Sequence, residues 1–209
     1  EGVQIVMASF NSWNGDKIHG NKMLLTDVLK GQLGFDGFVI GDWNGYGRVE
    51  GCSNDSCPQA INAGIDMLMA PKEWESLIRN TLEQVRSGLI SESRVDDAVR
   101  RILRVKVGAG MLERGLPSRR VAAGRVEVLG SKQHREVARE SVRKSLVLLK
   151  NNNATLPIKV AQKVLVAGDG AHSIPKQIGG WTSTWHGAGN KSEYFSDATS
   201  IYGGLKRAI

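Results

Sequence analysis

Gly34–Asn44 reads GFDGFVIGDWN and predicts a short buried strand that ends at a carboxylate. The apolar run Phe38–Ile40 lies between a glycine and polar residues, which is typical of a fully buried parallel strand. Asp42 follows this strand, with Trp43 directly after it. In β/α-barrel enzymes the chemistry lies at the carboxyl ends of the strands. A carboxylate beside an aromatic ring at such a position suggests a sugar site, and the alternative is that Asp42 only caps a turn.

The flanking sequence alternates between strand-like and helix-like segments. Val3–Phe10 and Ile65–Met69 are two further apolar runs, and segments with helical character lie at Lys22–Lys30 and Gln59–Ala63. Alternation at this spacing is typical of a parallel α/β architecture. The first part of the chain is therefore predicted to have the α/β fold class.

Two amphipathic helices should follow. Glu73–Ser87 has an apolar side and ends before Gly88, a residue suited to a helix end. Ser93 is predicted to begin the next helix, because Ser93 and Asp96 fit the N-terminal capping pattern. This second helix carries apolar residues at three- and four-residue steps, namely Val95, Val99, Ile102 and Val105.

The segment from Gly108 to Gly130 lacks periodicity and is rich in Gly, Pro and basic residues, which predicts a linker. A further helix is expected over Ser131–Lys150, with Val137, Val142, Leu146 and Leu149 on its apolar stripe. Lys163–Gly168 (KVLVAG) then predicts another buried strand. These elements would begin a second α/β domain.

Length and composition indicate a globular protein. The chain has 209 residues, of which 41% are hydrophobic, and 25 glycines. No apolar run approaches the ~20 residues of a membrane helix, so no membrane span is expected. The chain starts at Glu1 without a methionine or a leader, and Ile209 ends a helix-like segment, so we expect a piece of a longer protein.

The net charge of +7 arises mainly between Arg100 and Lys144, a segment that contains 13 Lys and Arg residues and only four Glu residues. A basic run can follow nucleic-acid phosphates. Here the charges alternate with aliphatic residues at helical spacing, and the run has no aromatic residue to stack on bases. The solvated faces of two helices explain it better, and no nucleic-acid partner is expected.

Cys52 and Cys57 stand in the sequence GCSNDSC. Their spacing is too wide for a redox C-x-x-C motif, and no second pair exists to complete a zinc site, so no metal is expected. They are either two free thiols or a small disulfide that clamps a loop. A disulfide would indicate an exported protein, periplasmic or extracellular.

Four segments together resemble glycoside hydrolase family 3, the β-glucosidase and exo-β-glucanase family. GFDGFVIGDW resembles the family's nucleophile segment, VRSGLISESRVDDAVRRILRVK the helix pair that closes its barrel, ESVRKSLVLLKNNNATLPI the entry to its second domain, and GGWTSTW a substrate loop there. The resemblance implies the C-terminal part of a (β/α)8 TIM-like barrel over 1–108, a linker over 109–130, and the start of a second α/β sandwich domain over 131–209. Gly41 departs from the serine of many members, and little consequence is expected.

The motifs most resemble the branch that acts on cello-oligosaccharides and β-1,3/1,4-glucans. The resemblance implies a retaining, exo-acting glucosidase without a cofactor, whose partner is a β-linked glucose oligosaccharide or glucan. Asp42 would be the catalytic nucleophile, which stays ionised and attacks the anomeric carbon. Arg48 matches a substrate-site arginine of the family, and its alternative is a surface arginine.

Aromatic residues complete the implied substrate site. Trp43 and Trp185 match two tryptophans that sandwich the sugar beyond the scissile bond, where flat rings suit the C–H faces of β-linked glucose. Trp181 either lines the same pocket or anchors its loop. Met7 and Phe10 match the pocket wall. For Met7, Phe10 and the tryptophans the alternative is core packing.

The general acid/base is not assigned. The family places it on a glutamate past residue 209, and neither Glu193 nor Asp197 matches its motif. The chain is therefore expected to hold one catalytic residue of two. Alternatives are another family 3 specificity, β-xylosidase or N-acetyl-β-glucosaminidase, and a non-catalytic carbohydrate-binding relative.

Overall fold

The computed structural model describes residues 2–209, which form two compact units. The first unit runs to Val126 and the second from Glu127 to Ile209. The boundary lies within the predicted linker, and the assignment of 1–108 and 131–209 to a barrel and a second domain stays a prediction.

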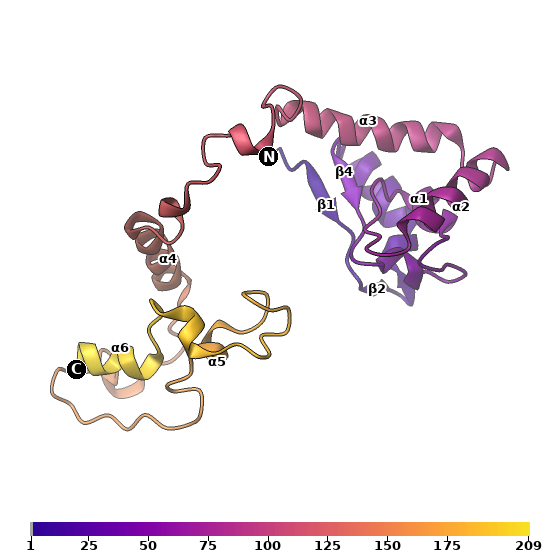
Figure 1. The fold of residues 1–209 in the computed structure, drawn as a ribbon. Coiled ribbons are helices and arrows are strands. Elements are labelled where there is room, and N and C mark those ends of the chain that lie inside the picture. The colour runs from indigo at the N-terminus through magenta and orange to yellow at the C-terminus, as the bar shows by residue number, and fades with distance from the viewer. Residues whose placement is uncertain (1) are drawn as a thin grey trace. The chain divides into compact units, whose positions relative to one another are not determined.

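Parallel pairing forms the centre of the first unit (Figure 1). β1 (Ile5–Met7) pairs in parallel with β4 (Phe38–Ile40), and Met7 lies opposite Ile40. On the other side of β4, Ile40 forms a parallel bridge with Met67. The predicted α/β class and the strand at Phe38–Ile40 are confirmed. The run Ile65–Met69 forms this isolated bridge and no regular strand.

A tight hairpin follows β1. Strands β2 (Ser12–Trp13) and β3 (Asp16–Lys17) pair antiparallel across Asn14 and Gly15. Both turn residues have positive φ, 50° and 95°, as a two-residue hairpin turn requires, and Asn-Gly is a preferred pair for it. This hairpin lies outside the elements expected from the sequence.

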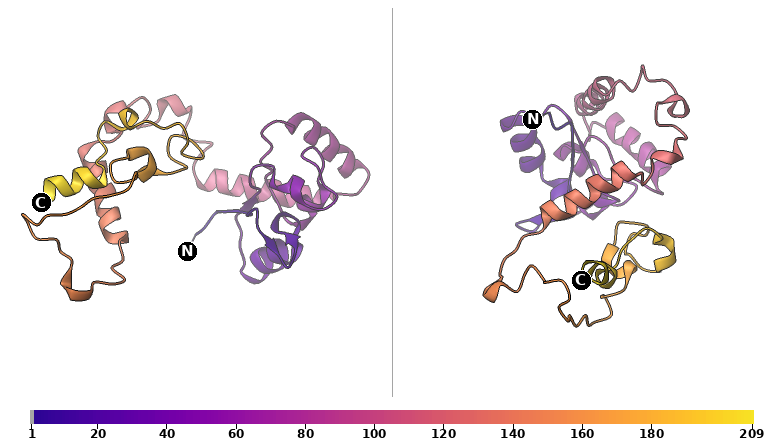
Figure 2. Two further views of the ribbon diagram at one scale, coloured as in Figure 1. Left: turned by 90° about the horizontal axis from the view of Figure 1, so that it is seen from below. Right: turned by 90° about the vertical axis from the view of Figure 1, so that its left-hand side faces the viewer.

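The helical segments up to Gly108 mostly agree with the sequence predictions (Figures 1 and 2). They are η1 (Ile18–Gly20), η2 (Met23–Gln32, with π-type turns), η3 (Gly45–Arg48), α1 (Pro58–Ala63), α2 (Trp74–Arg86) and α3 (Glu92–Gly108). The predicted start of α3 is wrong, because the helix begins before Ser93. Ser91 is its N-cap, and the Ser91 hydroxyl accepts a hydrogen bond from the Arg94 N–H at 3.2 Å. Ser91 has the extended backbone that a cap needs, whereas Ser93 already lies in the first turn.

The hydrophobic core lies between β4 and the helices η2 and α1. Its centre is formed by Val39, Tyr46 and Ile65, which are almost completely inaccessible to solvent. Tyr46 satisfies its hydroxyl by donating to the Asn54 carbonyl at 2.7 Å. The strand that precedes Asp42 is therefore held by the burial of Val39 and by parallel pairing with β1 on one edge and with Met67 on the other.

A buried network of ion pairs and hydrogen bonds binds the backbone of β4 and of the residues just before it. The Asp66 carboxylate is fully buried; it accepts from the Val39 N–H at 2.8 Å and from Lys30 Nζ at 2.8 Å, and it pairs with Arg94. Arg101 donates to two backbone carbonyls just before β4 at 2.8 and 2.9 Å. Arg101 belongs to the basic run that was predicted to lie on solvated helix faces. This prediction is wrong for Arg101, because these carbonyls and Asp97 bind its side chain and leave it 15% exposed.

The second unit consists of helices and irregular segments, with no strand among its described residues. Its helices are α4 (Lys132–Ser145), α5 (Ile174–Ile178) and α6 (Ile201–Ala208), with single turns η6 (Asn152–Ala154) and η7 (Ser192–Phe195). Turns η4 (Pro117–Arg119) and η5 (Val126–Val128) lie in the predicted linker.

Two predictions for the second unit are wrong. The predicted buried strand Lys163–Gly168 is irregular and Leu165 is 91% exposed, because no neighbouring strand in this unit pairs with it. The predicted helix over Ser131–Lys150 ends at Ser145, so the apolar residues Leu146 and Leu149 lie outside it and are exposed. Across residues 2–209, no helix is long and apolar enough to cross a membrane.

Candidate active site

Asp42 lies just past the carboxyl end of β4. The Ala8 N–H donates to the Ile40 carbonyl at 2.9 Å, and the Gly41 N–H donates to the Met67 carbonyl at 2.8 Å. The segments that follow β1 and Met67 therefore meet at the same edge as Asp42. This is the edge at which parallel α/β proteins place their ligand sites.

Several hydrogen bonds orient Asp42. Its carboxylate Oδ1 accepts from the Trp43 N–H at 2.7 Å, and its carbonyl accepts from the Gly45 N–H at 2.9 Å. Its own N–H donates to Nε2 of His19 at 3.0 Å. Asn44, and not Asp42, is the residue that precedes η3. The backbone and the carboxylate of Asp42 are thus both held in place.

His19 is a site residue that the sequence analysis missed. It lies in η1, and only 1% of it is exposed. Burial lowers the pKa of the His19 imidazole below its ordinary value of 6.5, and the negative charge of Asp42 partly opposes this. A single histidine in a polar stretch carries no spacing signal, so nothing in the sequence marked it.

The predicted pocket-wall residues lie at this edge and are exposed. Met7 ends β1 and Phe10 follows it, with 51% and 41% of the residue exposed. Trp43 is 60% exposed directly beside the nucleophile candidate. Met7, Phe10 and Trp43 therefore do not pack in a core among the described residues. Their role in a substrate pocket stays a prediction.

Arg48 ends η3, and its side chain is exposed. None of the ion pairs among residues 2–209 joins Arg48 to Asp42. Its role as a substrate-site arginine stays a prediction. The Gly41 position admits a Cβ atom, which would meet His19 Cδ2 at 3.4 Å, an ordinary contact.

The tryptophan loop lies in the second unit. The Trp181 N–H donates to the Trp185 carbonyl at 3.0 Å, and the two indole rings meet edge to face with centroids 6.5 Å apart. Trp185 also stacks on His186 at 4.3 Å. Both tryptophans are largely exposed, so neither packs in a core. Asp42 and Trp43 belong to the first unit, and the sugar clamp of Trp43 and Trp185 stays a prediction.

Cys52 and Cys57 form a disulfide with their Cα atoms 4.7 Å apart. It joins the segment after η3 to the residue that precedes α1. Cys57 is completely buried against Tyr46 and other core residues. The disulfide therefore anchors the loop that follows Arg48 to the core of the first unit.

Neither unassigned carboxylate near the tryptophan loop has the setting of an acid. Asp197 is paired with Arg135 at 2.5 Å, and Glu193 is exposed beside Lys191 at 4.0 Å. In the part of the chain that the structure describes, no cluster of His, Cys, Asp and Glu residues could hold a metal ion.

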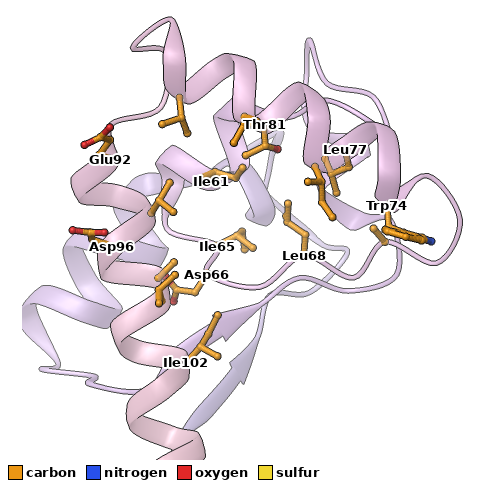
Figure 3. Close-up of a pocket in the computed structure, with 17 residues that line it drawn as sticks. Ile61, Ile65, Asp66, Leu68, Trp74, Leu77, Thr81, Glu92, Asp96 and Ile102 are labelled. Carbon is orange, nitrogen blue, oxygen red and sulfur yellow. The ribbon is translucent and has the colours of Figure 1, made fainter.

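An apolar cavity of about 630 Å³ lies away from this site, between α2 and α3 (Figure 3). Leu77 and Thr81 of α2 and Ile102 of α3 line it, and Glu92 and Asp96 stand at its edge. None of the predicted substrate residues lines it.

Comparison with known proteins decides the family. The model of the glycosyl hydrolase family 3 N terminal domain matches residues 1–105. The chain belongs to glycosyl hydrolase family 3. The resemblance inferred from the four sequence segments is therefore confirmed.

Individual relatives agree with this assignment. The exo-1,3/1,4-β-glucanase ExoP from a Pseudoalteromonas species is 55% identical with a TM-score of 0.91, over 99% of this chain and 26% of that one. A lysosomal β-glucosidase of Dictyostelium discoideum is 35% identical over 98% of this chain and 26% of its own length. A β-xylosidase of Formosa agariphila is 30% identical over 100% of this chain and 30% of its own length. The chain thus spans about a quarter to a third of these relatives.

Proposed function

We propose that the chain is part of a retaining, exo-acting β-glucosidase or β-glucan glucohydrolase. It would remove glucose from the non-reducing ends of cello-oligosaccharides or β-glucans. The observation that carries the proposal is Asp42, a carboxylate held at the carboxyl end of a buried parallel strand in a family 3 chain. The 55% identity to an exo-1,3/1,4-β-glucanase supports the substrate class.

The catalytic unit would be a polypeptide of the relatives' length, which we call the complete enzyme. Residues 1–108 would form the C-terminal part of its (β/α)8 barrel, and 131–209 would begin its second α/β domain after the linker. The parallel order of β1, β4 and Met67 supports a barrel wall. The apolar cavity between α2 and α3 and the exposed side chain of Ile5 support further barrel elements beside them.

The reaction would proceed in two displacements. The ionised Asp42 carboxylate attacks the anomeric carbon, the bond from that carbon to the leaving oxygen breaks, and the leaving oxygen takes a proton from an acid carboxyl group. Water then attacks the anomeric carbon, gives its proton to the same group, and releases Asp42 and a glucose of retained configuration. The acid/base should stand about 5–5.5 Å from Asp42 and is not assigned to a residue of this chain.

Exposed aromatic side chains would bind the substrate. Trp43 and Trp185 would clamp the sugar beyond the scissile bond, and Trp181 would line the same pocket. Met7 and Phe10 would form the wall beside Asp42, with Arg48 directed to substrate hydroxyl groups. The exposure of the tryptophans, Met7 and Phe10 supports this role, because it leaves their apolar surfaces free to contact the faces of a sugar ring.

The protein would be exported. The disulfide between Cys52 and Cys57 supports an oxidising compartment, because disulfides rarely persist in the cytosol. The polypeptide chain alone would carry out the reaction, without a cofactor.

The test follows the products of the complete enzyme by proton NMR. With 4-nitrophenyl β-glucoside and with β-1,3- and β-1,4-linked glucose oligosaccharides, β-glucose should appear before its α-anomer. The oligosaccharides should shorten by single glucose units. First release of α-glucose, or of internal fragments only, would contradict the proposal.

The β-xylosidase specificity is tested against the β-glucosidase specificity directly, because one relative is a β-xylosidase. We expect kcat/KM of the complete enzyme for 4-nitrophenyl β-glucoside to exceed that for the β-xyloside. The opposite ratio would assign the xylosidase specificity and leave the role of Asp42 unchanged.

A further inference from the structure

His19 makes an unusual contact with the residue proposed to attack the sugar. Its Nε2 accepts a hydrogen bond from the Asp42 backbone N–H at 3.0 Å. Since Nε2 is the acceptor, the proton of the neutral ring resides on Nδ1. The Ser9 backbone also interacts with His19, and this interaction raises the pKa of the imidazole. The Asp42 N–H thus occupies the one ring nitrogen that can accept in a neutral imidazole.

The surrounding backbone is shaped to hold this ring. A Cβ atom on Gly45 would lie 2.3 Å from Cε1 and 2.4 Å from Nε2 of His19, so any larger residue there would have to displace the ring. The Phe10 ring lies 6.0 Å away between ring centroids, at an angle of 56°. The seat of His19 thus combines the segment after β1 with the segment from Gly41 to Gly45.

Electrostatics keep the ring in the form that can accept. Burial lowers the pKa of His19, and the nearby charge of Lys17 lowers it further, while Asp42 and the Ser9 backbone act in the opposite direction. A protonated ring would direct an N–H at the N–H of Asp42 and would lose the hydrogen bond. Neutral His19 and the present position of the Asp42 backbone therefore depend on each other.

We propose that His19 is a positioning residue that aims the Asp42 carboxylate at the anomeric carbon by holding the Asp42 backbone. It does not touch substrate, and the proposal rests on the proposed role of Asp42 as nucleophile. Displacing a reacting group by about 1 Å can cost on the order of 100-fold in rate. The effect should fall on the covalent step and not on substrate affinity.

The test compares His19→Gln with His19→Leu in the complete enzyme. The glutamine amide oxygen can replace Nε2 as acceptor, whereas leucine fills the site without an acceptor. Each variant is treated with a series of concentrations of a 2-deoxy-2-fluoro β-glucoside that has an activated leaving group. The concentration dependence of labelling gives the affinity for the reagent separately from the rate constant of covalent labelling. His134→Leu, at an exposed histidine on α4, is the matched control.

We expect His19→Leu to lower the labelling rate constant on the order of 100-fold with affinity changed less than about threefold. His19→Gln should recover most of that loss, and His134→Leu should equal the wild type. Equal rates in both His19 variants, or a loss of affinity alone, would overturn the proposal.

A variant of Gly45, which adjoins the His19 ring, keeps the test decisive if His19→Leu does not fold. Gly45→Ala keeps the imidazole but displaces it, and it should lower the labelling rate constant in the same way as loss of the acceptor. A normal rate in Gly45→Ala together with a reduced rate in His19→Gln would overturn the proposal. The residue that carries the label in the wild type is also identified. A label on a residue other than Asp42 would refute the assignment of Asp42 as the nucleophile, and it would not bear on the contact between His19 and the Asp42 backbone.

Discussion

The two units of the chain differ in how completely their own residues satisfy one another. In the first unit, residues of that unit supply every hydrogen bond described for Asp42 and bury Val39 and Ile65. In the second unit, Leu146–Leu149 are 63–91% exposed. Burying one such side chain would contribute about 1.5–3 kcal/mol, which the second unit does not gain from its own described residues. The hydrogen bonds that hold Asp42 are thus local, whereas the second unit leaves a continuous apolar segment exposed.

The largest effect should come from removing the proposed nucleophile in the first unit. Asp42→Asn in the complete enzyme should lower kcat on the order of 10⁴-fold or more, because an amide cannot form the glycosyl ester. Steady-state kinetics on an aryl β-glucoside measures this. Asp36→Asn, at a carboxylate just before β4, should retain activity. Activity of Asp42→Asn within tenfold of the wild type would remove the chemistry from the first unit.

The buried ion network should matter for stability. Asp66→Asn leaves Lys30 and Arg94 without their buried carboxylate and should cost about 3–5 kcal/mol. A lower melting temperature of the complete enzyme would reveal it. The control Asp96→Asn breaks an exposed pair with Arg100 and should cost less than about 1 kcal/mol. Equal melting temperatures for the two variants would show that the first unit is not held by this network.

The tryptophan loop should contribute to binding and not to folding. Trp185→Ala should lower kcat/KM for oligosaccharides roughly ten-fold, or ~1–2 kcal/mol, and should affect aryl glucosides less. The melting temperature should stay unchanged because Trp185 is 67% exposed. The control is Tyr194→Ala, an exposed aromatic residue in the same unit. Loss of stability in parallel with activity on every substrate would make Trp185 a core residue of the assembled protein.

The smallest expected effect is a pH dependence of stability. Because burial lowers the pKa of His19 below 6.5 in the folded protein, the unfolded chain binds more protons as the pH falls through that value. The stability linked to neutral His19 is present above pH 6.5 and is lost as the pH decreases. Between about pH 7.5 and pH 5.5, His19→Gln should therefore lose less melting temperature than the wild type. His134→Gln should follow the wild type, and identical slopes in all three proteins would contradict a buried neutral His19.

The sequence predicted the first unit well because its signals are local. The run Phe38–Ile40 and the helix Trp74–Arg86 carry their own period and end signals, and the structure forms both. Asp42 was singled out because it stands just past an apolar strand and matches the nucleophile segment of the family, and its catalytic role stays a prediction. The prediction that Ser93 begins the helix was wrong because Ser91 and Ser93 stand close together. Only the backbone conformation shows that Ser91 is the N-cap.

Features that depend on distant partners could not be read from the sequence. His19 meets Asp42 only after the hairpin β2–β3 has returned the chain to the edge of β4. The strand predicted at Lys163–Gly168 has the right composition but no neighbour in its unit to pair with. In the sequence, Arg101 is indistinguishable from a surface charge. In the structure, it donates hydrogen bonds to the carbonyls of Phe35 and Gly37.

The most direct test of the central claim is the site of covalent labelling. The complete enzyme is treated with a 2-deoxy-2-fluoro β-glucoside, digested with trypsin, and analysed by fragmenting mass spectrometry. The account predicts the added sugar on peptide 31–48, with fragment ions that assign it to Asp42 and not to Asp36. A label on any other carboxylate would contradict the account, however active the enzyme proved to be.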